Sequence, residues 1–491
     1  MGIIINQSIK GSFWSYAGIV VGFITTSYLF PKFLTPETVG LFGLLIAYSV
    51  LMSQFSALGF HGVTSRLFPY FRNKENAHNG YLFVAAVVII TGFILFVMVF
   101  FFVKPLLIES NIEKSALFVD YIYLLLPLTF FTLIFIQLDV FNKVLYDAVF
   151  GTFLQEFFQR VLILLITILY VFNIFNLHQL ILAYAASVCF KGAFLFIYLL
   201  FKKKISFKPQ LAFIDKKLRN EMISVALFSI LTGLGNSIVF NIDKIIINQI
   251  LGLSQTGVYT IAFFFGTLVI IPSRALLRIS GTLIADAFKR KDLKYIADIY
   301  HRSCLNQFII GAFIFGGIWI NIDNILEVLG PDYEEGKWVI IIIGLAYLFD
   351  MLTGANSLVI AFSPFYKVAL IFILILIVLV VGTMYLLVPE FGVVGGAVAI
   401  GISIIANNIM RYTFLKIKYG MQPFNAKFLF VLFIFAGGIG LSYFLPKLNL
   451  IVDILIRSTI FAIIFISGIY VTKASEDFNL LVKKLKENYL F

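Results

Sequence analysis

Long apolar stretches, separated by short polar loops, run through almost the whole chain. A helix needs roughly twenty apolar residues to cross the hydrocarbon core of a membrane, and runs of that length recur from Ser8 to Thr472. Strands of a membrane barrel would instead alternate apolar and polar residues in segments of about ten. The pattern therefore predicts an all-α, polytopic membrane protein with about fourteen transmembrane helices.

The expected spans share this length and a continuous apolar character. They are Ser8–Phe30, Glu37–Phe60, Gly80–Val103, Leu117–Val140, Phe150–Phe172, Leu177–Phe201, Met222–Leu251, Gly257–Ala285, Ser303–Ile325, Trp338–Ala361, Val368–Val388, Val393–Leu415, Lys427–Leu445 and Ile451–Thr472.

Basic residues gather in alternate loops, which predicts how the chain is oriented. One set of loops carries clusters such as Lys202–Lys204 and Lys289–Lys291, whereas the other set carries isolated lysines near acidic residues. Positively charged loops stay on the cytoplasmic side, so an even number of spans places both termini in the cytoplasm. Residues 474–491 are expected to form a basic amphipathic tail on that membrane surface.

The composition supports a membrane protein and excludes several other classes. Hydrophobic residues make up 61% of the chain and charged residues only 13%, whereas soluble proteins carry about 25% charged residues. The net charge of +12 is dispersed over loops and does not form the basic face of a nucleic-acid-binding protein. Two cysteines and four scattered histidines fit no disulfide framework, metal site or haem motif, so no metal and no cofactor are expected.

An internal repeat relates the two halves of the chain. The segment Leu251–Tyr259, which joins spans seven and eight, is similar to the segment Leu34–Phe42, which joins spans one and two, and Gly257 follows Gly40 by 217 residues. The same offset relates the basic loops that begin at Arg72 and Lys289. Six spans per repeat preserve orientation, so we expect two parallel six-helix bundles about a pseudo-two-fold axis along the membrane normal.

The repeat also sets the expected domain organisation. The expected parts are an N-terminal bundle (1–201), a cytoplasmic linker (202–221), a C-terminal bundle (222–418), two additional spans (419–473) and the tail (474–491). Parallel repeats of this kind are one design of alternating-access transporters.

Three segments resemble the polysaccharide-export flippases, the Wzx-like branch of the multidrug/oligosaccharidyl-lipid/polysaccharide (MOP) exporter superfamily. They are FLTPETVGLFGLLIAY, FNIDKIIINQILGLSQTGVYTIAF and VPEFGVVGGAVAIGIS. The resemblance covers essentially the whole chain, including its twelve-plus-two layout, and implies the fold of this superfamily, which is also that of the MATE transporters.

The resemblance implies a flippase of the bacterial cytoplasmic (inner) membrane. Such a protein moves an undecaprenyl-diphosphate-linked oligosaccharide to the outer leaflet for surface polysaccharide such as O-antigen, without enzymatic chemistry. Its partners would be the lipid-linked oligosaccharide, membrane lipids, a coupling cation (Na⁺ or H⁺) and polysaccharide assembly enzymes. Two alternatives stay open: a cation-coupled drug exporter, and an intramembrane polysaccharide polymerase or acyltransferase.

Ionisable residues within the spans are the first candidates for a functional site. The resemblance implies a cavity between spans one, two, seven and eight, and span eight carries Arg274 and Arg278 one turn apart. A guanidinium group suits diphosphate oxygens. Both arginines could instead snorkel to the interface, because Arg274 lies roughly 25 Å into the span at 1.5 Å per residue.

Further candidates lie on spans two and seven. Span two ends near His61 and Arg66, and the repeat offset makes His61 the partner of Arg278. Span seven carries the polar residues Asn236, Asn241, Asp243 and Lys244. We expect Arg274, Arg278, His61, Arg66, Asn236 and Asn241 to contact substrate in a central cavity. Asp243 and Lys244 are candidates for cation coupling or for a structural charge pair.

Overall fold

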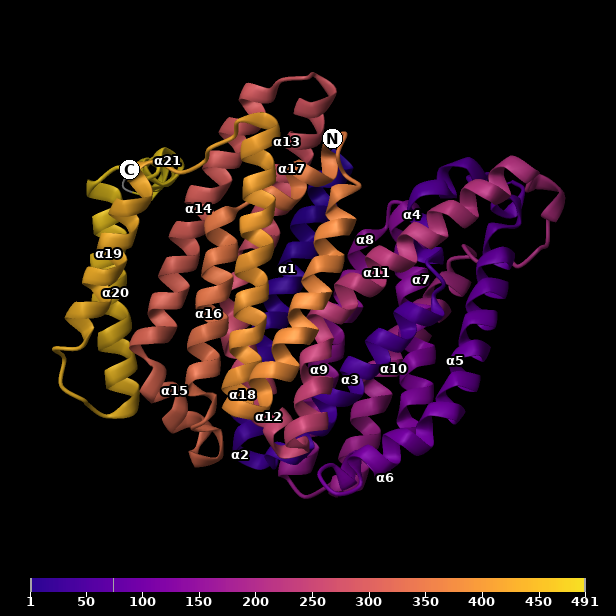
Figure 1. The fold of residues 1–491 in the computed structure, drawn as a ribbon, viewed down its shortest axis with the longest axis horizontal. Helices are drawn as coiled ribbons and strands as arrows, with labels where there is room; N and C mark the ends of the chain where they lie inside the picture. Colours follow the sequence, from indigo (N-terminus) through magenta and orange to yellow (C-terminus); the bar gives the residue numbers. More distant parts are fainter. Residues whose placement is uncertain (1, 74, 490–491) are drawn as a thin grey trace. The chain divides into compact units, whose positions relative to one another are not determined.

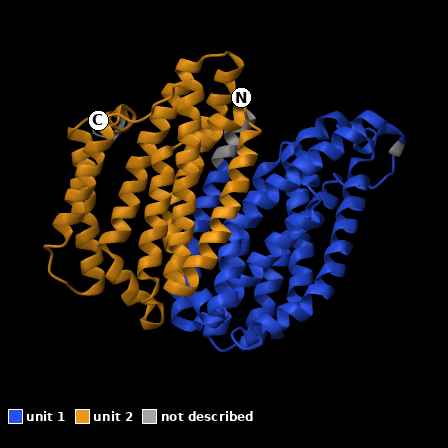
Figure 2. Cartoon of the chain, viewed as in Figure 1, with its two compact units in different colours: residues 1–260 blue, residues 261–491 orange. Residues whose placement is uncertain are grey.

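The computed structural model describes residues 2–73 and 75–489, which form helices and no strand. The all-α prediction is therefore confirmed. Met1, at the start of the expected N-terminal bundle, and residues 490 and 491, at the end of the expected tail, lie outside the described residues. The chain folds into two compact units, residues 1–260 and residues 261–491 (Figure 2).

The first unit consists of the helices that precede residue 261. They are α1 (Gly2–Ile24), α2 (Phe30–Phe33), α3 (Pro36–Ser56), α4 (Phe60–Phe71), α5 (Tyr81–Asn111), α6 (Ala116–Asp120), α7 (Leu125–Val144), α8 (Ala148–Thr152), α9 (Gln159–Val171), α10 (Leu177–Phe201), α11 (Lys216–Leu251) and the start of α12 (Leu253–Thr267). Two π-helical segments, Thr25–Leu29 and Phe153–Phe158, continue α1 and precede α9.

The second unit contains the end of α12 and the helices that follow. They are α13 (Ser273–Lys289), α14 (Leu293–Ile320), α15 (Ile322–Leu329), α16 (Gly336–Thr353), α17 (Asn356–Phe362), α18 (Val368–Tyr419), α19 (Ala426–Ser442), α20 (Leu450–Val471) and α21 (Glu476–Tyr489). The last of these, α21, lies within the expected tail, 474–491.

Membrane-spanning helices account for most of the described chain. Twelve of the described helices are long and apolar enough to cross a membrane. One of them, α18, holds two expected spans that reverse direction at Gly392, where φ is 58° and ψ is −141°, and its two arms lie side by side in Figure 1. With the shorter apolar helix α19, the described residues contain the fourteen expected spans.

The expected span Gly257–Ala285 is not one continuous helix in the structure. The helix α12 ends at Thr267, and a 3-10 turn from Leu268 to Ile270 completes the apolar span. The next helix, α13, begins at Ser273 after Pro272. Proline has no amide hydrogen to donate and clashes with the preceding turn. The second expected span, Glu37–Phe60, ends at a comparable break, which a left-handed glycine makes: α3 ends at Ser56, and α4 begins after Gly59, whose φ is 68°. Both repeats therefore carry a broken helix at this point.

Within the first unit, the repeat-related helices α3 and α12 cross at a pair of glycines. A Cβ atom at Gly40 would lie 2.1 Å from the Leu253 carbonyl oxygen, and one at Gly257 would lie 1.8 Å from the Pro36 carbonyl oxygen. Leu253 follows Pro36 by the same 217 residues that separate the two glycines. The two contacts are thus reciprocal, as expected for a pseudo-two-fold axis that passes between them.

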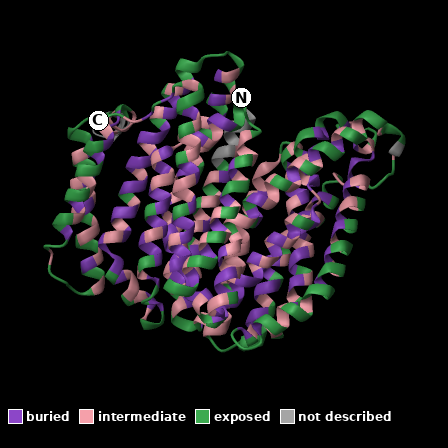
Figure 3. Ribbon diagram, in the orientation of Figure 1, coloured by how far each residue is buried: buried purple, intermediate pink, exposed green. Residues whose placement is uncertain are grey.

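The core of the first unit lies between α4, α5 and α7. Phe68, Tyr81 and Phe141 are fully buried there, and the rings of Phe68 and Phe141 meet edge to face with centroids 5.2 Å apart. In contrast, α5 exposes large apolar side chains such as Phe101 and Phe102 along one side (Figure 3). Such surfaces suit a lipid environment, and the chain is a multi-pass membrane protein.

Candidate functional site

The polar residues predicted on span seven lie on α11, which packs along α3 and α4 within the first unit. Asp243 is buried, and its Oδ2 accepts a hydrogen bond of 3.1 Å from the Tyr259 hydroxyl. The Lys244 ammonium lies 3.6 Å from Asp243 Oδ1. Because these two neighbours form a mostly buried ion pair, their charges largely cancel within the bundle.

Asn236 and Asn241 lie nearer the middle of α11. Asn236 is exposed, whereas Asn241 is half-buried and donates a hydrogen bond of 2.9 Å to the Ser237 carbonyl. Asn236 and Asp243 are seven residues apart on one helix, but only Asn236 is accessible. Of the predicted polar residues on α11, Asn236 is thus the best placed to meet a ligand.

His61 lies at the start of α4, beside the backbone of α11. A Cβ atom at Gly233 would lie 3.2 Å from His61 Nε2 and 3.0 Å from Gln54 Oε1. His61 Nδ1 and Gln54 Oε1 are both buried and have no hydrogen-bond partner within the described part of the chain. Buried polar atoms without a partner are costly, so these two atoms mark a place where water or a ligand can bind.

The close approach of α4 to α11 explains why His61 takes this position. Gly59 is left-handed, with φ 68°, and a Cβ atom there would lie 2.1 Å from the Ala226 carbonyl oxygen. Only glycine fits both the conformation and the contact. Arg66, one to two turns beyond His61 on α4, has an exposed side chain.

Arg274 and Arg278 belong to the second unit. Both lie on α13, which packs against α14 and α17, and both side chains are exposed one helical turn apart. The break before α13 places them outside the continuous apolar span that ends at Ile270. They can therefore present their guanidinium groups to an anion without the full cost of burial in hydrocarbon.

The second unit also contains a buried polar cluster that the sequence did not reveal as a unit. Asn408 Nδ2 donates a hydrogen bond of 2.7 Å to Asp350 Oδ1, while its Oδ1 accepts bonds from Thr353 and Asn356 at 2.8 and 2.9 Å. Asp350 is visible in the sequence as an acidic residue within an apolar span, but its partner on α18 is not. Sequence analysis also missed Gln54, because an uncharged amide within a span is a weaker indication of function than an ionisable group.

An apolar groove of about 860 Å³ lies beside this cluster, between α14, α16, α18 and α19. Its walls include Leu348, Phe349, Ile409 and Phe428, and only a few polar side chains reach it. A groove with this lining can hold a hydrocarbon chain.

Comparisons with known proteins agree with this architecture. The model of a family described as polysaccharide biosynthesis protein matches residues 8–284, which is more than half of the chain. No curated protein sequence matches the chain significantly.

Solved structures of two kinds of transporter are similar to the chain. The lipid II flippase MurJ in an inward closed conformation has a TM-score of 0.74 at 14% identity, with 94% of this chain and 98% of that chain covered. An inward-facing multidrug resistance MATE family transporter of the MOP superfamily has a TM-score of 0.65 at 15% identity, with coverages of 83% and 98%. A MATE in complex with MaD3S has a TM-score of 0.54 at 16% identity, with coverages of 84% and 96%.

At identities this low, the structural matches establish the fold alone. The match to the family model establishes membership of the family. The resemblance found in the sequence is thereby confirmed. The chain belongs to the polysaccharide biosynthesis protein family.

Proposed function

We propose that the protein is a flippase of the bacterial cytoplasmic membrane. It moves an undecaprenyl-diphosphate-linked oligosaccharide from the cytoplasmic to the outer leaflet, for the assembly of surface polysaccharide such as O-antigen. The family assignment supports polysaccharide synthesis as the pathway, and the likeness to the lipid II flippase MurJ supports a lipid-linked cargo. No covalent chemistry is part of this proposal.

The observation that carries the proposal is the repetition of a broken helix with basic residues after each break. In the first repeat, His61 and Arg66 follow the break between α3 and α4. In the second repeat, Arg274 and Arg278 follow the break before α13. We propose that these four side chains, with Asn236 and Asn241, bind the diphosphate and nearby sugars in a central cavity. The lipid tail would then stay in the bilayer and in apolar grooves on the protein.

Alternating access would come from movement of the repeat 1–201 against the repeat 222–418, with 202–221 as a cytoplasmic linker and both termini in the cytoplasm. Asp243 is the candidate for coupling this movement to a cation, Na⁺ or H⁺. Its Oδ1 accepts no hydrogen bond from any residue that the structure describes, although Lys244 lies nearby. A cation that displaced the Lys244 ammonium group could be coordinated by the buried Oδ1 atom of Asp243.

The test is the accumulation of lipid-linked oligosaccharide in a strain that lacks the gene. We expect the precursor to accumulate on the cytoplasmic face and the wild-type gene to cure the defect. The double variant Arg274→Ala and Arg278→Ala should cure it poorly. The matched control, Lys289→Ala and Arg290→Ala at the end of the same helix, should cure it fully.

Other outcomes have distinct meanings. Equal rescue by both double variants would keep the flippase and remove the two arginines from the binding site. A strain that accumulates no precursor would refute the flippase and favour a drug exporter or an intramembrane enzyme.

A further inference from the structure

A second cavity of the second unit has a volume of about 370 Å³. It lies where the turn between α14 and α15 meets the loop between α19 and α20. Its lining combines aromatic rings with carboxylate, amide and ammonium groups. It includes Trp319, Trp338, Tyr443, Asp323, Asn324 and Lys337. Under the proposed orientation this cavity opens on the outer side of the membrane, where a flipped glycan is released.

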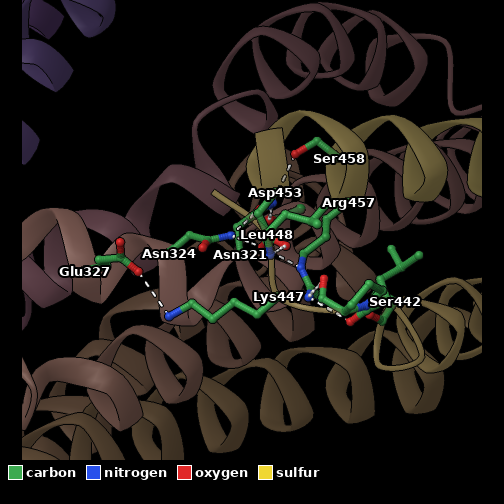
Figure 4. Close-up of polar contacts among 12 residues, drawn as sticks. Asn321, Asn324, Glu327, Ser442, Lys447, Leu448, Asp453, Arg457 and Ser458 are labelled. Atoms are coloured by element: carbon green, nitrogen blue, oxygen red, sulfur yellow. Dashed lines mark hydrogen bonds and ion pairs between the residues drawn. The ribbon is translucent and has the colours of Figure 1, made fainter. Parts of the chain in front are cut away.

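One wall of the cavity is a fixed hydrogen-bond network (Figure 4). Arg457 Nε donates to Asp453 Oδ2 at 2.6 Å, and its other nitrogens donate to the carbonyls of Ser442 and Leu445 at 2.7 and 3.1 Å. Asn324 Nδ2 donates to the same Asp453 oxygen at 2.7 Å. This wall is rigid because each group in it already has a partner.

The charges around the cavity balance one another. Arg457 pairs with Asp453, Lys337 Nζ lies 2.7 Å from Asp323 Oδ1, and Lys447 Nζ lies 3.1 Å from Glu327 Oε2. Each of these three cations thus has its own carboxylate. Neither a diphosphate nor a metal ion would find uncompensated charge here, whereas a neutral ligand rich in hydroxyl groups could bond to both kinds of partner.

The aromatic side chains supply the second requirement for such a ligand. Two of the three tryptophans in the chain line this cavity. Trp319 Nε1 donates a hydrogen bond of 3.0 Å to the Tyr443 hydroxyl, which orients both rings, and the Trp338 side chain is 57% exposed. Flat rings beside hydrogen-bonding groups match a sugar, whose ring has an apolar face and a rim of hydroxyls.

We propose that this cavity is a glycan-docking site, which holds sugars of the oligosaccharide on the release side after translocation. The proposal rests on the proposed flippase function and its orientation. It adds a site to the central cavity, so that the glycan head group is held while the lipid leaves. Aromatic residues at membrane interfaces also act as plain anchors, and the experiment separates the two roles.

The test uses the purified full-length protein in nanodiscs and its tryptophan fluorescence. The probe is the glycan released by mild acid from the lipid-linked precursor of the same strain. We expect a saturable fluorescence change with the wild type and with Trp14→Phe, because Trp14 packs against Phe153 in the other unit with ring centroids 4.7 Å apart. Trp338→Ala and Tyr443→Ala, both at exposed side chains, should each bind roughly tenfold more weakly, the loss of about one aromatic contact.

Binding that is unchanged in both exposed-ring variants would overturn the proposal and leave these rings as interface anchors. A wild-type protein that shows no glycan-dependent change, yet cures the deletion strain, would also overturn the docking site while the flippase stands. If the glycan binds as expected but the deletion strain accumulates no precursor, the docking site is supported and the proposed translocation fails.

Discussion

Replacing Gly257 by alanine tests the crossing of the two repeat-related helices most directly. The added Cβ would meet the Pro36 carbonyl oxygen at 1.8 Å, whereas real Cβ atoms are essentially never closer than 3.0 Å to such an atom. The contact is with the backbone, which no side-chain rotation can relieve. The helices α3 and α12 must therefore separate locally by about 1.2 Å.

The size of the effect follows from this separation. A gap of 0.5–1 Å already forfeits roughly a quarter to a half of the dispersion energy of the atoms that face it. Overpacking of a closely packed interior usually costs about 1–3 kcal/mol. We expect Gly257→Ala to lower the free energy of unfolding by about this amount. Gly40→Ala should do the same, since its Cβ would meet the Leu253 carbonyl oxygen at 2.1 Å.

The two substitutions should not be additive. Either one separates the same pair of helices, so the second finds the clash partly relieved. The assay is the denaturation midpoint of purified protein in one detergent, compared with Gly437→Ala, a helical position with no atom within 4 Å of the new Cβ. A Gly257→Ala variant as stable as this control would refute the reasoning, and a double variant whose loss is the full sum would refute the shared crossing.

Three further predictions concern polar contacts. Asn408→Leu should lower the free energy of unfolding by about 2–4 kcal/mol, because it leaves several buried partners without a hydrogen bond. Denaturant titration would measure this loss, and a loss below about 1 kcal/mol would count against a stabilising role of the cluster. Arg457→Met should cost about 3 kcal/mol by leaving the Asp453 carboxylate buried and unpaired, and adding Asp453→Asn should recover part of that loss in the same titration. Asp477→Ala removes an exposed ion pair with Arg302 and a hydrogen bond from Asn306, so stability should change by only about 1 kcal/mol. Limited proteolysis should nevertheless cut before α21 more readily, and an unchanged digest would contradict this docking of α21.

The spans were predictable because a membrane imposes a length on each helix that can be read locally. Leu177–Phe201 was predicted at the bounds that α10 has, and the reversal within α18 was expected from the two apolar runs on either side of Gly392. The offset of 217 residues between the two halves was also visible in the sequence, and the reciprocal contacts of Gly40 and Gly257 agree with it.

The polar network of the candidate site was less predictable, because it depends on which helices meet. The break before α13 coincides with Pro272 and the 3-10 turn that precedes it. Gln54 and His61 come together only because Gly233 lets α3 and α4 approach the α11 backbone. No property of those residues in the sequence identifies that contact.

The reversal at Gly392 has a consequence for how the second unit can move. The two arms of α18 are joined without a separate loop, and a Cβ atom at Gly395 would lie 2.1 Å from the Leu387 carbonyl oxygen of the opposite arm. This close contact beside the turn holds the two arms together there, so we expect them to move as one rigid pair. In the proposed transport cycle, flexing of the second unit would then concentrate at the interruption after Ile270, where the helix is already broken.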